Sequence, residues 1–143
     1  MPETKTKLGS PVIATTWEDA NLCHDFLAGR AVTGVAHALN QTVIDFHSRK
    51  QNTCETSAHG SEFVAARTAT DQIIDLRLAL RHLGIPVCRS VMFGDNKSVV
   101  TSSTIPHSQL NKRWTASSCH RVREAVGRDF AGCWCPLASR PRC

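Results

Sequence analysis

Three acidic residues occupy positions from which a folded chain could gather them into one site: Asp19, Glu62 and Asp95. Asp19 follows a β-branched and aromatic run at 11–17, and Asp95 follows a short apolar run at 90–94. Glu62 stands near the start of a helical pattern, on the same side as its apolar stripe. Adjacent carboxylates repel one another unless cations lie between them, and Mg²⁺ prefers carboxylate, water and phosphate oxygens. The positions therefore suggest a two-ion site, for Mg²⁺ or Mn²⁺, that activates water for phosphodiester hydrolysis.

Each acid also has an ordinary structural explanation, and taken singly that explanation is the favoured one. Asp19 is of a type common in turns, and Asp95 could cap the helix that follows it. Glu62 could favour its own helix through the macrodipole. Asp25 lies close to Asp19 in the chain and is its rival for the first position. The hypothesis of a joint site depends on all three carboxylates converging.

The elements that must position these acids are three strands, a helix, a strand and a helix. The first strand is expected over 11–17 and to end at Glu18-Asp19; the next two are expected over 31–39 and 42–48. Asn40-Gln41 makes the short turn of an antiparallel meander. If the first and fourth strands are parallel neighbours, Asp19 and Asp95 emerge at the edge where open α/β sheets bind ligands.

The long helix is predicted over 61–83 from apolar residues that recur at intervals of three and four. The stripe comprises Ala66, Ala69, Ile73, Leu76, Leu80 and Leu83. Ser57 or Ser61 could cap its start, and Gly84 terminates it. A short helix through 99–100, a polar loop at 101–108 and a basic helix from 110 to about 126 follow. The order predicts a mixed α/β sheet flanked by helices, with Trp17, Phe46, Phe93 and Trp114 in the core.

Composition sets the broad class of the protein. A chain of 143 residues with 41% hydrophobic content suits one domain, expected over 11–126 between a polar tail at 1–10 and a Cys-rich tail at 127–143. The formal net charge of +5 mildly favours a polyanionic partner. No apolar run approaches the roughly 18 residues of a membrane span, and residues 1–10 lack a secretory signal. An intracellular location, cytoplasmic or nuclear, is expected.

Seven cysteines are scattered through the chain, and no two of them form a CxxC pair. Zinc sites usually have about two to four residues between paired cysteines, so Cys133 and Cys135 are too close together and the others are scattered. Free thiols in a reducing compartment are the favoured interpretation, and a zinc-binding module is the minor alternative.

Five segments, in order, resemble the ribonuclease H domain of copia-type retrotransposon polyproteins. They are DAN at 19–21 with GRAVTG at 29–34, FHSRKQ at 46–51, GSEFVA at 60–65, FGDNKS at 93–98 and HRVRE at 120–124. The likeness spans roughly residues 11–126. It implies a ribonuclease H-like fold with strand order 3-2-1-4-5 and cleavage of the RNA strand of RNA–DNA hybrids with two divalent ions. It places the first three metal-binding carboxylates on Asp19, Glu62 and Asp95.

The chain departs from this family after Val126, where it reads GRDFAGCWCPLASRPRC. The family continues there with a fifth strand and a segment of Asn-Pro-Ala-Asp type, whose aspartate completes the metal site. We therefore expect the fifth strand to be absent or reduced to a stub within 130–135. Glu18 also departs from expectation, because an apolar residue would suit its strand position. Two functions stay open: a Mg²⁺-dependent nuclease, ancestrally fused to a reverse transcriptase, and a non-catalytic remnant that binds nucleic acid.

Contacts to the substrate are predicted from basic residues. Arg30, Lys50, Lys97, Lys112 and Arg113 could neutralise phosphates, although a solvated basic face explains each of them equally well. Recognition of a hybrid would depend on backbone shape and 2′-hydroxyl groups. His107 and His120 are candidates for proton transfer, with packing or surface roles favoured.

Overall fold

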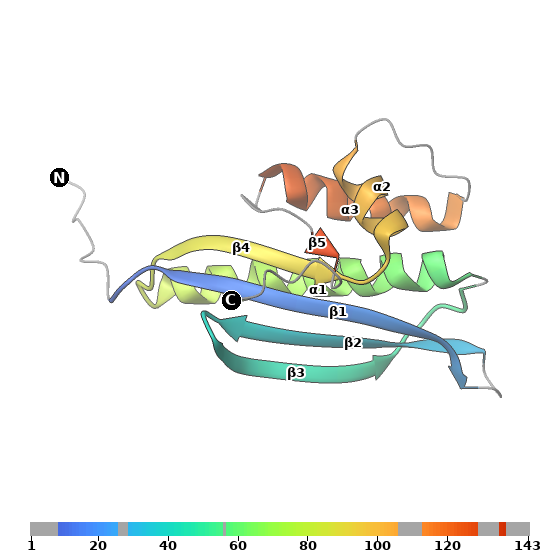
Figure 1. Ribbon diagram of the computed structural model, residues 1–143, viewed down its shortest axis with the longest axis horizontal. Coiled ribbons are helices and arrows are strands. Elements are labelled where there is room, and N and C mark those ends of the chain that lie inside the picture. Colours follow the sequence, from blue (N-terminus) through green and yellow to red (C-terminus); the bar gives the residue numbers. More distant parts are fainter. Residues whose placement is uncertain (1–8, 26–28, 56, 106–112, 129–134, 137–143) are drawn as a thin grey trace.

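One mixed β-sheet with a long helix across one face forms the framework of the protein (Figure 1). The computed structural model describes residues 9–25, 29–55, 57–105, 113–128 and 135–136; within these ranges the side chains of 23–25, 113–115, 128 and 135–136 are not described. Helix α1 packs against β1, β2 and β4, and α3 packs on α1. Among the described residues, no helix is both long and apolar enough to cross a membrane.

The sheet has the strand order β3-β2-β1-β4-β5, as the family resemblance implies. Its strands are β1 (Val12–Asp25), β2 (Arg30–Leu39), β3 (Thr42–Lys50), β4 (Val87–Gly94) and β5 (Cys135–Pro136). The β1–β2 and β2–β3 pairs are antiparallel, whereas β1–β4 and β4–β5 are parallel. The expectation of a reduced fifth strand agrees with the two residues of β5, the first of which, Cys135, is the last residue of the predicted stub.

Strand β1 is much longer than predicted, and the expectation that it ends at Glu18-Asp19 is wrong. It runs on to Asp25, because residues from Asp19 onwards continue to pair with β2. Pairing with β4 stops at Glu18, opposite Gly94. The polar residues of the extension fit this arrangement, since Asp19 and Asn21 are exposed. Figure 1 shows β1 and β2 running past the end of β4.

Helix α1 (Ala58–His82) begins at the cap Ser57, whose hydroxyl accepts a hydrogen bond from the Gly60 N–H. It therefore starts three residues earlier than predicted, with the first of the two candidate caps. Gly84, in the left-handed conformation at φ 78°, follows the helix as its terminator. Most of the predicted stripe is buried, but Leu83, the C-cap, is 63% exposed.

Helices α2 (Lys97–Thr104) and α3 (Arg113–Arg128) complete the described fold. The predicted polar loop at 101–108 is wrong over 101–104, which continue α2. The remainder of that loop and the predicted start of the next helix at 110 fall in 106–112, outside the described residues. The apolar side of α3 joins the core through Val122 and Cys119, against Phe63 of α1 and Met92 of β4.

The aromatic side chains do not all enter the core. Phe46 is 78% exposed, which contradicts the prediction, because it projects from the edge strand β3 on the sheet face opposite α1. Trp17 and Phe93 are half-buried and stack with ring centroids 6.1 Å apart. Their neighbours Thr16 and Met92 point inwards, so the stacked pair lies on the sheet face opposite α1. The side chain of Trp114 lies outside the described part.

Candidate metal centre

Asp19, Glu62 and Asp95 converge in the folded chain. Each offers a carboxylate oxygen, and the three oxygens lie within 4.8 Å of one another. Among the described residues, no other group of three or more His, Cys, Asp or Glu side chains is placed to hold one ion. The carboxylates come from a strand, a helix and a strand end that are far apart in the sequence. Their role as metal ligands stays a prediction, but the geometry that this role requires is present.

The parallel pairing of β1 with β4 brings two of these acids together. Trp17 pairs with Phe93 and Glu18 with Gly94. Asp19 is the next residue of β1, and Asp95 directly follows the end of β4. The two aspartates therefore lie side by side just beyond the last β1–β4 pair. Glu62 joins them because α1 packs across β1 and β4 with its N-terminal part at this end.

The ordinary explanations for two of the acids are wrong. The helix that follows Asp95 is capped by Asn96, whose Oδ1 accepts from the backbone N–H groups of Ser98 and Val99 at 3.0 and 3.3 Å. Asp19 lies within β1, opposite Gly34, and not in a turn. The side chain of the rival Asp25 is outside the described part.

Glu62 is buried next to two other carboxylates, with one of its oxygens unpartnered. Its residue is 6% exposed, and its Oε2 has no hydrogen-bond partner. Burial, and then the negative charges of Asp95 and Asp19, raise the pKa of Glu62 to about 7, while a hydrogen bond from the Ala20 backbone opposes the rise. A divalent cation would complete the coordination of the orphaned oxygen and neutralise the repulsion. The residues present therefore fit such an ion.

Glu18 adds a fourth carboxyl group at the centre. It is 3% exposed on the α1 side of β1, and its Oε2 also lacks a partner. Burial first, and then Glu62, Asp95 and Asp19, raise the pKa of Glu18 well above its usual range. Glu18 does not belong to the group that one ion could bridge. The sequence marked its position as unusual without indicating its closeness to Glu62.

No protein-family model and no curated protein matches the sequence. Solved structures do match the fold. The N-terminal RNase H domain of rv2228c from Mycobacterium tuberculosis has a TM-score of 0.64 and 14% identity, over 90% of this chain and 85% of that chain. LC11-RNase H1 in complex with an RNA/DNA hybrid gives 0.54 and 14%, over 89% and 86%. The prototype foamy virus protease–reverse transcriptase gives 0.53 and 15%, over 95% of this chain but 18% of that one. The chain has the ribonuclease H fold.

The basic residues predicted to contact nucleic acid are dispersed over this ribonuclease H fold. Lys97 is exposed at the start of α2, two residues after Asp95. Arg30 is exposed at the far end of the β1–β2 hairpin, and Lys50 ends β3. Lys112 lies outside the described residues, as does the side chain of Arg113 at the start of α3. Of the two histidines predicted as candidates for proton transfer, His120 is exposed and His107 lies outside the described residues.

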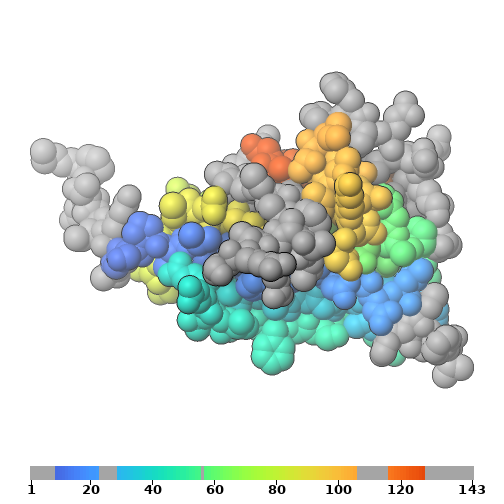
Figure 2. Space-filling view, in the orientation of Figure 1, coloured from blue at the N-terminus to red at the C-terminus, as the bar shows by residue number. Residues whose placement is uncertain are grey.

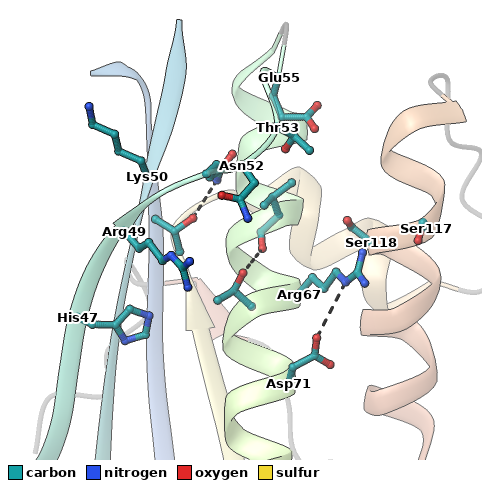
Figure 3. A pocket seen from close by; sticks show the side chains of 14 residues that line it. His47, Arg49, Lys50, Asn52, Thr53, Glu55, Arg67, Asp71, Ser117 and Ser118 are labelled. Atoms are coloured by element: carbon teal, nitrogen blue, oxygen red, sulfur yellow. Dashed lines mark hydrogen bonds and ion pairs between the residues drawn. The ribbon is translucent and has the colours of Figure 1, made fainter. Parts of the chain in front are cut away.

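A polar pocket of about 340 Å³ lies between the end of β3, the outer side of α1 and α3. Figure 3 shows the Arg49 guanidinium reaching from β3 towards α1, and that of Arg67 reaching from α1 towards α3. Lys50 and Asn52 also line it. Neither Arg49 nor Arg67 is among the basic residues that the sequence predicts as contacts. Arg49 adjoins the predicted Lys50, whereas nothing in the sequence distinguishes Arg67 from any other basic residue on an exposed helix face.

Gln51 connects this pocket to the carboxylate centre. Its side chain is 4% exposed, and its Nε2 donates to Thr33 Oγ1 at 2.9 Å and to the Ser61 carbonyl at 2.8 Å. The end of β3 is thereby attached to the first turns of α1, next to Glu62. Gln51, the last residue of the FHSRKQ segment, thus fixes the end of β3 beside Glu62, a contact that the sequence does not indicate.

Proposed function

We propose that this chain hydrolyses the RNA strand of RNA–DNA hybrids in a reaction that requires divalent cations. The observation that carries the proposal is the approach of three carboxylates, from β1, α1 and the end of β4, to within 4.8 Å. The ribonuclease H fold supports it, because a protein of the same fold, LC11-RNase H1, has been solved with an RNA/DNA hybrid.

In the proposed reaction Asp19, Glu62 and Asp95 hold Mg²⁺, with Mn²⁺ as a substitute. Two such ions, when bound, supply the charge that activates the attacking water and stabilises the leaving oxygen. The chain holds the three carboxylates on separate rigid elements, which fixes their geometry before substrate arrives. Lys97, exposed beside this centre, is placed to neutralise a phosphate.

The pocket supports a second set of contacts along the substrate backbone. Arg67 is five residues after Glu62, and therefore about 7.5 Å further along the helix axis. Arg49 and Lys50 line the same pocket from β3. We propose that these cations contact phosphates of the hybrid, while its A-like shape and 2′-hydroxyl groups select it over other duplexes.

We further propose that the chain is a module of a copia-type retrotransposon polyprotein, with a reverse transcriptase as its ancestral fusion partner and an intracellular place of action. Five sequence segments resemble that family. The match to the foamy virus protease–reverse transcriptase, where this chain corresponds to 18% of the length, supports a module within a longer polypeptide.

A second candidate function is nucleic-acid binding without catalysis. It is favoured by the sequence after Val126, which contains no Asn-Pro-Ala-Asp segment to supply a fourth ligand. The burial of Glu18 beside the site carboxylates also favours binding without catalysis, because a further buried carboxyl group raises the free-energy cost of assembling the centre.

Incubation of a labelled RNA–DNA hybrid with the purified chain separates the two functions. The first predicts cleavage of the RNA strand in Mg²⁺ or Mn²⁺, lost in Asp95→Asn and retained in Asp75→Asn, which alters an exposed carboxylate of α1. Salt-sensitive binding with no cleavage in either metal would favour the second. Equal cleavage by the wild type and Asp95→Asn would exclude this site as the source of activity.

A further inference from the structure

Strand β3 has the features of an interface rather than of an ordinary sheet edge. It lies at the end of the strand order, and every one of its nine residues except His47 is exposed. Three of the exposed residues are large and apolar: Val43 at 56%, Ile44 at 44% and Phe46 at 78%. In Figure 2 its turquoise atoms form part of the lower border of the molecule. Long apolar edges without proline readily pair with another strand, and proteins usually protect them.

The outward backbone groups of β3 can be identified from its pairing with β2. The Gln51 N–H donates to the Ala31 carbonyl at 2.8 Å, so this position points towards β2. Alternation along an antiparallel ladder then directs the N–H and C=O groups of Phe46 and Ser48 away from β2. These groups are available to a further strand.

The sequence of β3 is complementary to itself about a two-fold axis through Phe46. An antiparallel copy in that register sets Phe46 against Phe46 of the second copy. Asp45 then lies opposite His47 of that copy, with Arg49 of that copy on the diagonal, and cross-strand pairs of opposite charge are favourable. The side chains of His47 and Asp45 share the α1 side of the sheet, where His47 Nε2 contacts Gln72 Nε2 at 3.1 Å.

We propose that the chain forms a symmetric homodimer by antiparallel pairing of β3 with β3 of a second copy. The apolar row that crosses the open face, Phe46, Ala36, Trp17 and Phe93 in cross-strand register, then continues into the second copy through the two Phe46 rings. The pairing satisfies the outward backbone groups and covers the most exposed apolar side chain in the described part of the chain.

The dimer leaves the carboxylate centre unobstructed, because that centre is built from β1, α1 and the end of β4. A strand-to-strand contact of this length buries less than the roughly 1,200 Å² of standard interfaces, so the association belongs to the weak class. We expect the dimer to form as the chain concentration rises through about 1 to 100 µM.

Sedimentation velocity of the full chain over that concentration range tests the proposal. The wild type should move from monomer to dimer. Phe46→Lys should raise the dissociation constant about tenfold or more, because it places two cations at the axis. Ser48→Pro should do the same by removing one outward donor, a change that edge strands tolerate. Leu83→Lys, which alters a comparably exposed residue at the end of α1, should leave the dimer unchanged.

The proposed register of β3 against β3 is tested separately through Asp45 and Arg49. Asp45→Arg should weaken the dimer by like-charge repulsion, and the double change Asp45→Arg with Arg49→Asp should restore it. Circular dichroism identifies any variant that fails to fold, and Ser48→Pro and Phe46→Lys serve as independent checks. A wild type that stays monomeric throughout, or a dimer that survives both Phe46→Lys and Ser48→Pro, overturns the proposal. None of these outcomes depends on nuclease activity.

Discussion

Glu18 and Glu62 are neighbouring buried carboxylates, and in each of them the Oε2 atom has no hydrogen-bond partner. The charge of Glu62 contributes to the raised pKa of Glu18. Burying two such groups is costly unless hydrogen bonds or a cation compensate their desolvation. In the metal-free protein, these two glutamates therefore lower the stability of the folded state, and they do so at the site of the proposed chemistry.

Replacing Glu18 with valine should stabilise the protein. Glu18→Val removes a buried carboxyl group, which the unfolded chain ionises freely, from a strand position that suits an apolar residue. We expect the free energy of unfolding at pH 7.5 to rise by about 1–3 kcal/mol. Urea denaturation of the wild type and Glu18→Val measures this difference in the free energy of unfolding. The gain should shrink at pH 4.5, where Glu18 of the wild type is protonated in the folded state. An unchanged or lower stability of Glu18→Val at pH 7.5 would contradict the prediction.

The stability of the metal-free protein should fall as the pH rises from about 4.5 to 7. Folding raises the pKa of Glu62 from 4.5 to about 7, so the folded state holds its proton more tightly than the unfolded state. The resulting stabilisation is complete below 4.5 and is lost by about 7, with an upper limit of about 3 kcal/mol. Denaturation in a chelating buffer at several pH values measures the slope. Glu62→Gln should flatten it, and an equal slope in that variant would argue against Glu62 as its source.

Divalent cations should stabilise the folded chain through the same carboxylates. A cation that binds only the assembled site stabilises the folded state, so the melting temperature should rise with Mg²⁺ or Mn²⁺ concentration. Asp95→Asn should abolish most of this rise, whereas Asp75→Asn, on the exposed side of α1, should preserve it. Differential scanning fluorimetry is sufficient for the comparison. A rise of equal size in both variants would locate the cation elsewhere.

Asp95 and Asn96 should respond in opposite ways to substitution. Asn96→Ala removes the cap of α2 and should lower the free energy of unfolding by about 1 kcal/mol. Asp95→Asn removes one charge from a repulsive cluster and caps nothing, so the metal-free protein should be no less stable than the wild type. Urea denaturation of both variants in chelator makes the comparison. A clear loss in Asp95→Asn would indicate a structural role for that residue.

Arg49 should contribute to hybrid binding through charge. In Arg49→Ala, the slope of log affinity against log salt concentration should decrease by about 1, as for one lost phosphate contact. Arg81→Ala, at the exposed end of α1, is the matched control and should keep the wild-type slope. Fluorescence anisotropy without divalent metal avoids cleavage during the titration. Identical slopes for Arg49→Ala and the wild type would remove Arg49 from the interface.

The convergence of Asp19, Glu62 and Asp95 could be predicted because each stands beside a strand or helix whose pattern is clear. Parallel neighbours place their carboxyl ends together whatever the surrounding sequence. The strand order came from the family resemblance. The burial of Glu18 among these acids could not be predicted in the same way, since it depends on which face of β1 receives α1.

Two further differences between the predicted and the observed structure arise from neighbouring elements that the sequence does not reveal. β1 extends to Asp25 because β2 continues to pair with it, although its own residues there are polar. Phe46 was assigned to the core because it is apolar, but its burial depends on the strand's place in the sheet. Local pattern indicates the kind of element, whereas exposure is decided by what packs against it.

The overhang of the β1–β2 hairpin beyond β4 gives the carboxylates a boundary on one flank. Seven residues, from Asp19 to Asp25, continue past the last β1–β4 pair, which at about 3.3 Å each projects roughly 20 Å. The acids therefore lie beside a projecting hairpin and not on an open edge of the sheet. For the proposed hybrid substrate, this projecting hairpin would limit the angles from which a rod-shaped duplex reaches the carboxylates, before any phosphate is bound.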